Sequence, residues 1–217
     1  MGRELVKELI NSKKWSKVTV VVRRKLEEWE QFNDNEKAKL EIICKESLDS
    51  LEDVSQWKLE GYSSVFCCLG TQTKVGKEQF IKVDYTYPLY GGQLALHFKV
   101  PHYSIVSSYG ADSKSILLYT RTKGEVESSL RELNLPHLSV ARPGFLQNRG
   151  NDMRVVERIA SIIPMIPKID TGEVARALRI EAELQHESPL KEKFRIYSNN
   201  DLIFIAKNET YPPYTNI

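Results

Sequence analysis

The fold is decided by residues 102–142, which read HYSIVSSYGADSKSILLYTRTKGEVESSLRELNLPHLSVAR. An apolar run at 102–107 predicts a buried strand, and a strongly periodic stretch at 115–133 predicts a helix. A second apolar run at 138–142 predicts another strand. A strand, a helix and a further strand in this order are typical of a parallel pair joined by a helical crossover.

The flanking sequence repeats this alternation in both directions. Strands are predicted at 17–22, 40–44, 63–69 and 194–197. Helices are predicted at 4–10, over part of 77–98, at 152–163, at 171–185 and at 201–207. Short apolar strands separated by helices are what a parallel sheet covered on both faces requires. The sequence therefore predicts an α/β fold, a Rossmann-like doubly wound parallel sheet.

Two details of the helices follow from single residues. Pro88 and the pair Gly91-Gly92 are expected to bend or break the helix that begins near Lys77. Thr171 is the expected N-cap of the helix at 171–185, with Glu173 in its first turn.

The composition is that of an ordinary globular protein. The 217 residues are 41% apolar and 28% charged, with a formal net charge of +2, which argues against a nucleic-acid or membrane surface. No apolar run approaches 18 residues, so no membrane span is predicted. We expect a cytoplasmic protein that can also be nuclear.

Neither cysteines nor histidines form a recognisable pattern. The three cysteines are Cys44, Cys67 and Cys68, an odd number with two adjacent in the chain, so no disulfide framework is predicted. The four histidines are His97, His102, His137 and His186. Their spacing is not that of metal ligands, and no metal site is predicted.

Tyr119 and Lys123 are the strongest catalytic candidates. Residues four apart on a helix project from the same face, about 6 Å apart along the axis. A nearby ammonium favours the phenolate, which would make Tyr119 an acid/base near neutral pH. Ser107 and Ser108, at the end of the strand at 102–107, could hold a substrate oxygen. The alternative is that Tyr119 packs on the sheet and Lys123 is solvated.

Arg23 and Arg24 directly follow the strand at 17–22. In dinucleotide-binding folds an acid at this point suits a free ribose 2′-hydroxyl, whereas an arginine accommodates a 2′-phosphate. Two guanidinium groups and no acid favour NADP over NAD. The alternative is a solvated basic turn.

Five runs in one order carry a family resemblance: VTVVVRRKL (18–26), FCCLGT (66–71), VSSYGAD (106–112), YTRTKGEVE (119–127) and ARPGFL (141–146). They resemble the atypical short-chain dehydrogenase/reductases, and within these the oxidoreductases of the HIV Tat-interactive protein 2 type. The resemblance implies an NAD(P)-binding Rossmann-like core at 1–150 and a C-terminal substrate-side subregion of the same domain at 151–217. It also implies hydride transfer between NADPH and an unidentified carbonyl or alcohol.

By position, the resemblance makes Tyr119 the proton donor and acceptor, and Lys123 the group that lowers its pKa and holds the nicotinamide ribose. Ser107 or Ser108 would orient the substrate carbonyl, and the motif does not decide between them. The cofactor-binding residues implied are Arg23, Arg24, Leu69, Gly70, Thr71, Tyr119, Lys123 and Leu146.

One family motif is missing from the sequence. The family begins with a strand and a Gly-x-x-Gly-x-x-Gly turn that cradles the pyrophosphate, and Gly2 matches only its last glycine. The absent strand would lie between the strands at 17–22 and 63–69. We therefore expect a truncated gene model or isoform, or a protein that binds NADPH weakly or not at all. The alternative function is a non-catalytic regulatory or scaffolding protein that uses the same fold to bind protein partners.

Overall fold

The computed structural model describes residues 1–148 and 166–213, so the helix expected at 152–163 lies outside the described residues. The helices are α1 (Gly2–Asn11), α2 (Asp34–Lys39), α3 (Lys77–Ile81), α4 (Tyr87–His97), α5 (Leu118–Glu132), α7 (Thr171–Glu187) and α8 (Asn199–Asn208). The strands are β1 (Val18–Val22), β2 (Leu40–Cys44), β3 (Ser64–Cys67), β4 (His102–Val106), β5 (Leu138–Ala141), β6 (Phe145–Gln147), β7 (Lys168–Asp170) and β8 (Phe194–Tyr197).

All strand pairs in the described residues are parallel, which confirms the predicted α/β fold. One sheet contains β1 and β2, another has the order β3-β4-β5-β8, and β6 pairs with β7. The central pair aligns Tyr103 with Leu138 and Val106 with Ala141. Within the described part of the chain no ladder joins β1 to β3, and this is the place where the sequence analysis expects a missing strand.

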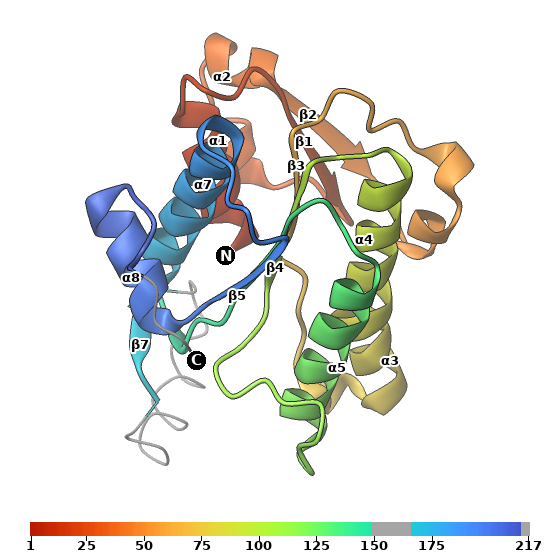
Figure 1. Ribbon diagram of the computed structural model, residues 1–217. Helices are drawn as coiled ribbons and strands as arrows, with labels where there is room; N and C mark the ends of the chain where they lie inside the picture. The colour runs from red at the N-terminus through yellow and green to blue at the C-terminus, as the bar shows by residue number, and fades with distance from the viewer. Residues whose placement is uncertain (149–165, 214–217) are drawn as a thin grey trace.

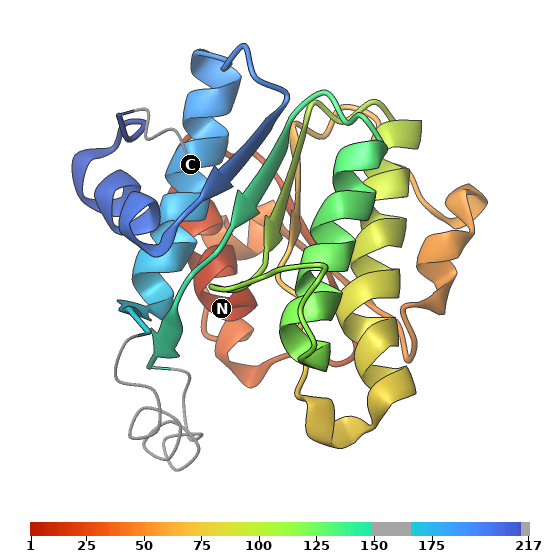
Figure 2. The ribbon, with the colours of Figure 1, turned by 60° about the horizontal axis from the view of Figure 1, so that its bottom comes forward.

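Helices cover both faces of the sheets (Figures 1 and 2). Helices α3, α4 and α5 lie on one side, and α1, α7 and α8 lie on the other. Successive residues of β4 point to opposite faces, so Ile105 packs in the core under α4 and α5, while Val106 packs in the core under α1 and α7. Two cores on two faces are the signature of a doubly wound fold.

The expected break in the helix at 77–98 does not occur. A turn of π-helix, Lys82–Thr86, joins α3 to α4 without leaving helical backbone geometry. Pro88 lies two residues after this π-helical turn, and its missing N–H does not interrupt the helix. A side chain at Gly92 would run into Leu130 of α5, so this glycine lets two helices approach closely. The predicted break was wrong, because Gly92 serves the packing of α4 against α5.

The N-cap of α7 is Asp170, not Thr171. The Asp170 side chain accepts a hydrogen bond from the Gly172 N–H at 2.6 Å, and Glu173 reaches back to the Asp170 N–H. This reciprocal pair is a capping box, which requires the acid three residues after the cap. Glu173 meets that spacing from Asp170.

None of the helices described in residues 1–148 and 166–213 has the length and apolar character to span a lipid bilayer.

Candidate functional site

The predicted site residues meet at the carboxyl edge of the four-stranded sheet. Gly70, Ser107 and Pro143 follow β3, β4 and β5, which are neighbours in that sheet. The Ser107 N–H donates to the Ala141 carbonyl at 2.8 Å, and the Tyr109 N–H donates to the Pro143 carbonyl at 2.8 Å. These bonds fix the loop after β4 against the loop after β5. Ligands of open α/β sheets bind at this edge.

Helix α5 carries Tyr119 and Lys123 one turn apart, as the spacing predicts. Lys123 is only 3% exposed, and its Nζ lies 2.8 Å from the Asp84 Oδ1. Tyr119 is 39% exposed, and its ring centroid lies 5.9 Å from that of Phe80. The phenol is therefore open to a ligand, while the ammonium is held by an acid from another helix.

Asp84 is the site residue that sequence reasoning missed. It is fully buried in the π-helical turn, a distortion that is frequent at functional sites. Its Oδ2 accepts a hydrogen bond from the Thr71 N–H at 2.8 Å, while Oδ1 has no well-directed hydrogen bond and faces Lys123 as an ion pair. Asp84 thus ties the loop after β3 to α5. The signal was an acid four residues after Phe80, on the buried helical face.

A second buried acid, Glu127, holds the loop after β4. The Ser107 hydroxyl donates to Glu127 Oε1, and Arg142 donates to the same carboxylate from Nε at 3.1 Å and from Nη2. Ser108 is half-buried, and its hydroxyl donates only to the Tyr109 carbonyl, at 3.2 Å. The two serines therefore differ: the hydroxyl of Ser107 is committed to a carboxylate, and that of Ser108 is not.

The remaining predicted residues lie in three different parts of the fold. Arg23 and Arg24 are exposed at the end of β1, in the two-stranded sheet. Leu69 is half-buried and Gly70 is exposed, in the loop after β3. Leu146 is buried on β6, where it packs in the core under α1 and α7.

Helix α1 begins at the carboxyl edge of the four-stranded sheet. A Cβ added at Gly2 would lie 3.5 Å from the Cβ of Cys68, so the start of α1 adjoins the end of β3. No side chain caps this helix start. A helix N-terminus presents N–H groups and a partial positive charge, which suit a phosphate. Together with the exposed Arg23 and Arg24, these groups fit the phosphates of a dinucleotide.

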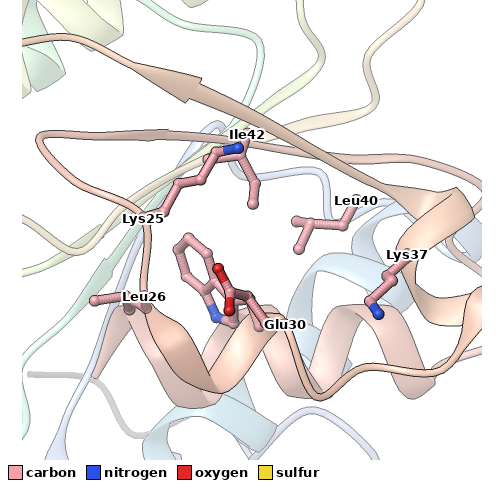
Figure 3. A pocket seen from close by; sticks show the side chains of 7 residues that line it. Lys25, Leu26, Glu30, Lys37, Leu40 and Ile42 are labelled. Atoms are coloured by element: carbon pink, nitrogen blue, oxygen red, sulfur yellow. The ribbon is translucent and has the colours of Figure 1, made fainter.

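A separate pocket of about 200 Å³ lies against the two-stranded sheet (Figure 3). Leu40 and Ile42 of β2 and the buried Trp29 form its apolar lining, with Lys25 and Lys37 among the polar residues. Tyr119 and Lys123 do not line it. The pocket is therefore not part of the site that the predicted catalytic residues form.

No protein-family model matches the chain. Over 160 residues it is 40% identical to Protein HTATIP2 of Rattus norvegicus, an alignment that covers 73% of the chain and 64% of that relative. Over 164 residues it is 30% identical to the mitochondrial Protein FMP52 of Lodderomyces elongisporus, covering 71% of the chain and 66% of that relative. The chain thus matches about two thirds of the length of these curated relatives.

A solved structure, MoeE5 in complex with UDP-glucuronic acid and NAD, superposes with a TM-score of 0.68. It is 18% identical and covers 91% of this chain and 72% of its own. At this identity the likeness shows the fold alone.

The comparisons also correct one prediction. The expected cytoplasmic or nuclear location was wrong, because fungal relatives are named mitochondrial proteins, which points away from a purely cytoplasmic location. Composition and charge report bulk surface properties, whereas an address is read by receptors from local signals. The five sequence motifs, the parallel fold and the 40% identical relative agree, and the chain is similar to HTATIP2 and to the atypical short-chain dehydrogenase/reductases.

Proposed function

We propose that the protein is a nicotinamide-dependent oxidoreductase that prefers NADP and acts on a carbonyl or alcohol at the carboxyl edge of the four-stranded sheet. The observation that carries this proposal is the buried Lys123–Asp84 ion pair one helical turn from the accessible Tyr119, on the helix whose Glu127 binds the Ser107 hydroxyl. A fixed positive charge next to an accessible phenol is an arrangement suited to proton transfer.

The residues have separable roles in the proposed reaction. The bound cofactor supplies or accepts the hydride. Tyr119 gives its phenolic proton to the oxygen of the carbonyl as that carbon is reduced, and takes a proton from the alcohol in the reverse direction. Lys123 stabilises the resulting phenolate and is itself held in place by Asp84. Ser108 donates a hydrogen bond to the same substrate oxygen, because the hydroxyl of Ser107 is already bonded to Glu127.

The preference for NADP rests on charge at the end of β1. Arg23 and Arg24 are both exposed, and neither forms an ion pair with an acid among the residues that the structure describes. Planar guanidinium groups bind phosphate oxygens in a bidentate manner. The chain matches only part of the length of its relatives, so the proposal rests on this chain's own residues and not on the partners or substrates of those proteins.

The test is a comparison of Tyr119→Phe with the wild-type chain, using 9,10-phenanthrenequinone as a general carbonyl probe and NADPH oxidation as the readout. We expect at least a 100-fold loss of turnover, since general acid catalysis contributes about 10²–10⁴-fold. NADPH affinity, followed by its fluorescence, should stay within about twofold. Full turnover in Tyr119→Phe would remove this residue from the mechanism. Cofactor binding by a wild-type chain that reduces no carbonyl would favour the scaffolding alternative.

A further inference from the structure

We propose that His102, His137 and Glu181 bind one Zn²⁺ ion beneath α7. The three side chains are 3%, 1% and 2% exposed. Their nearest ligand atoms, one from each residue, all lie within 4.8 Å of one another. His102 begins β4 and His137 immediately precedes β5, so the cluster lies at the amino edge of the sheet, opposite the candidate catalytic site. The proposal is therefore independent of the proposed function.

The tautomer of His137 is fixed by the backbone. Its Nδ1 lies 2.9 Å from the carbonyl oxygen of Glu192. A carbonyl can only accept, so Nδ1 carries the hydrogen and Nε2 of the neutral ring keeps a lone pair. That Nε2 is buried and has no hydrogen-bond partner. A histidine oriented by a backbone carbonyl with its other nitrogen left open is the usual arrangement of a metal ligand.

Glu181 brings the negative charge. Its Oε1 accepts from the Ser139 hydroxyl at 2.7 Å, while its Oε2 is buried without a hydrogen bond. His137 Nε2 and Glu181 Oε2 thus lie buried in one cluster without a well-directed hydrogen bond, and the nearest possible donor to Oε2 is His102 Nε2 at 3.2 Å. Leaving such groups unmatched in a core is costly.

Two of the separations are close to those around a tetrahedral ion, and the three ligand atoms, which lie within 4.8 Å of one another, must draw together when the ion binds. His102 Nε2 lies 3.2 Å from Glu181 Oε2, and His137 Nε2 lies 3.7 Å from Glu181 Oε1. Zinc bonds of about 2.0–2.2 Å place neighbouring ligands about 3.3–3.5 Å apart in a tetrahedron. Ser139 Oγ, 3.1 Å from His102 Nε2, is positioned to be a fourth, neutral oxygen. Two imidazoles and a carboxylate are a donor set that zinc commonly takes.

No local sequence pattern marks this cluster, because its members come from three separate elements. Position 102 is on one strand, 137 precedes the next strand, and 181 is on α7. Only the packing of α7 over β4 and β5 brings them together. The alternative occupant is a proton shared between His102 and Glu181, which would leave His137 Nε2 unmatched.

The first experiment measures metal in the full-length chain. The protein is refolded with equimolar Zn²⁺, because the site is closed in the folded state, then passed over a chelating resin and assayed by elemental mass spectrometry. We expect one Zn²⁺ per chain, and visible bands of tetrahedral Co²⁺ when cobalt replaces zinc. A wild-type chain that retains no zinc and shows no such bands overturns the proposal, and this outcome needs no variant to fold.

Two variants locate the ion. His137→Asn keeps a nitrogen donor for the Glu192 carbonyl and deletes the Nε2, while Glu181→Gln keeps the shape and removes the charge. Each should lower the retained zinc at least tenfold. His97→Asn and His186→Asn, at histidines outside the cluster, are the matched controls and should retain a full equivalent. Zinc that persists in both cluster variants, or disappears in a control, overturns the assignment to this cluster.

Discussion

Replacing Lys123 by Met should destabilise the protein far more than an equal change at its surface. Lys123 and Asp84 are 4% and 1% exposed at their side chains and 2.8 Å apart. Removing one partner of a buried ion pair leaves an uncompensated charge and costs about 3–5 kcal/mol. In a protein of this length 1 kcal/mol corresponds to about 2–4 °C in the melting temperature, so we expect a fall of about 6–20 °C.

A double-mutant cycle separates the pair from other effects of the substitution. Asp84→Asn preserves an acceptor for the Thr71 N–H and removes the charge. The double variant Asp84→Asn/Lys123→Met buries no charge at this point, so it should be more stable than Lys123→Met. The coupling free energy should be about 2–3 kcal/mol, within the range of residues in direct contact. The free energy of unfolding is measured by urea denaturation followed by circular dichroism.

The matched control is an ion pair of the same length on the surface. Lys17 Nζ also lies 2.8 Å from a carboxylate, that of Glu41, but the two side chains are 55% and 49% exposed. Lys17→Met should cost far less than Lys123→Met, because water screens the pair and solvates whichever charge remains. If Lys123→Met and Lys17→Met destabilise the protein equally, or if the double variant is no better than Lys123→Met, the burial argument fails.

Three further predictions concern the cofactor, the cysteines and the helix packing. Arg23→Ser/Arg24→Ser should weaken NADPH binding about 10- to 100-fold and leave NADH binding nearly unchanged, as measured by fluorescence titration; equal loss for both nucleotides would contradict the 2′-phosphate assignment. Burial raises the pKa of Cys67, and raises that of Cys68 to about 12, so both stay protonated thiols at pH 8. The exposed Cys44 alone should then react with a maleimide in the native chain, against three thiols in denaturant; labelling of a second native thiol would refute this. Gly92→Ala should cost about 1–3 kcal/mol, because the added Cβ meets the flexible side chain of Leu130. Gly124→Ala should destabilise the protein more, because its Cβ meets the backbone of Asp112 and Ser113. The reverse order in urea denaturation would count against this packing.

The sequence predicted six of the eight described strands, because each of the six is a short apolar run that ends at a turn or polar residue, and it missed the three-residue strands β6 and β7. The run at 40–44 matches β2 at both ends, and the run at 138–142 exceeds β5 by one residue. The helix ends were harder. Glycine and proline usually mark breaks, but Gly92 serves a close helix contact and Pro88 follows a π-helical turn inside a continuous helix. Such cases depend on the neighbouring element, which no local pattern reports.

The candidate site divides in the same way. The spacing of Tyr119 and Lys123 is local, so their common helix face could be predicted, and the convergence of the loops at Gly70, Ser107 and Pro143 follows from the parallel fold. The acids that form ion pairs with Lys123 and Arg142 could not be predicted. Asp84 is 39 residues before Lys123, and Glu127 joins α5 to Arg142 beyond the next strand. Pairing between distant elements is decided by packing, and the roles proposed for Tyr119, Lys123 and the two serines stay predictions.

The arrangement of the two sheets bears on how a cofactor would act on this protein. The proposed phosphate contacts, Arg23 and Arg24, follow β1, whereas Lys123 and Ser108 belong to the four-stranded sheet and its helices, and no ladder joins the two sheets in the described residues. A dinucleotide that reached both groups would therefore bridge a boundary that backbone hydrogen bonds do not cross. Because such a ligand binds only the folded arrangement, it stabilises that arrangement by mass action. The proposed cofactor would thus stabilise the relative position of the two sheets as well as take part in chemistry.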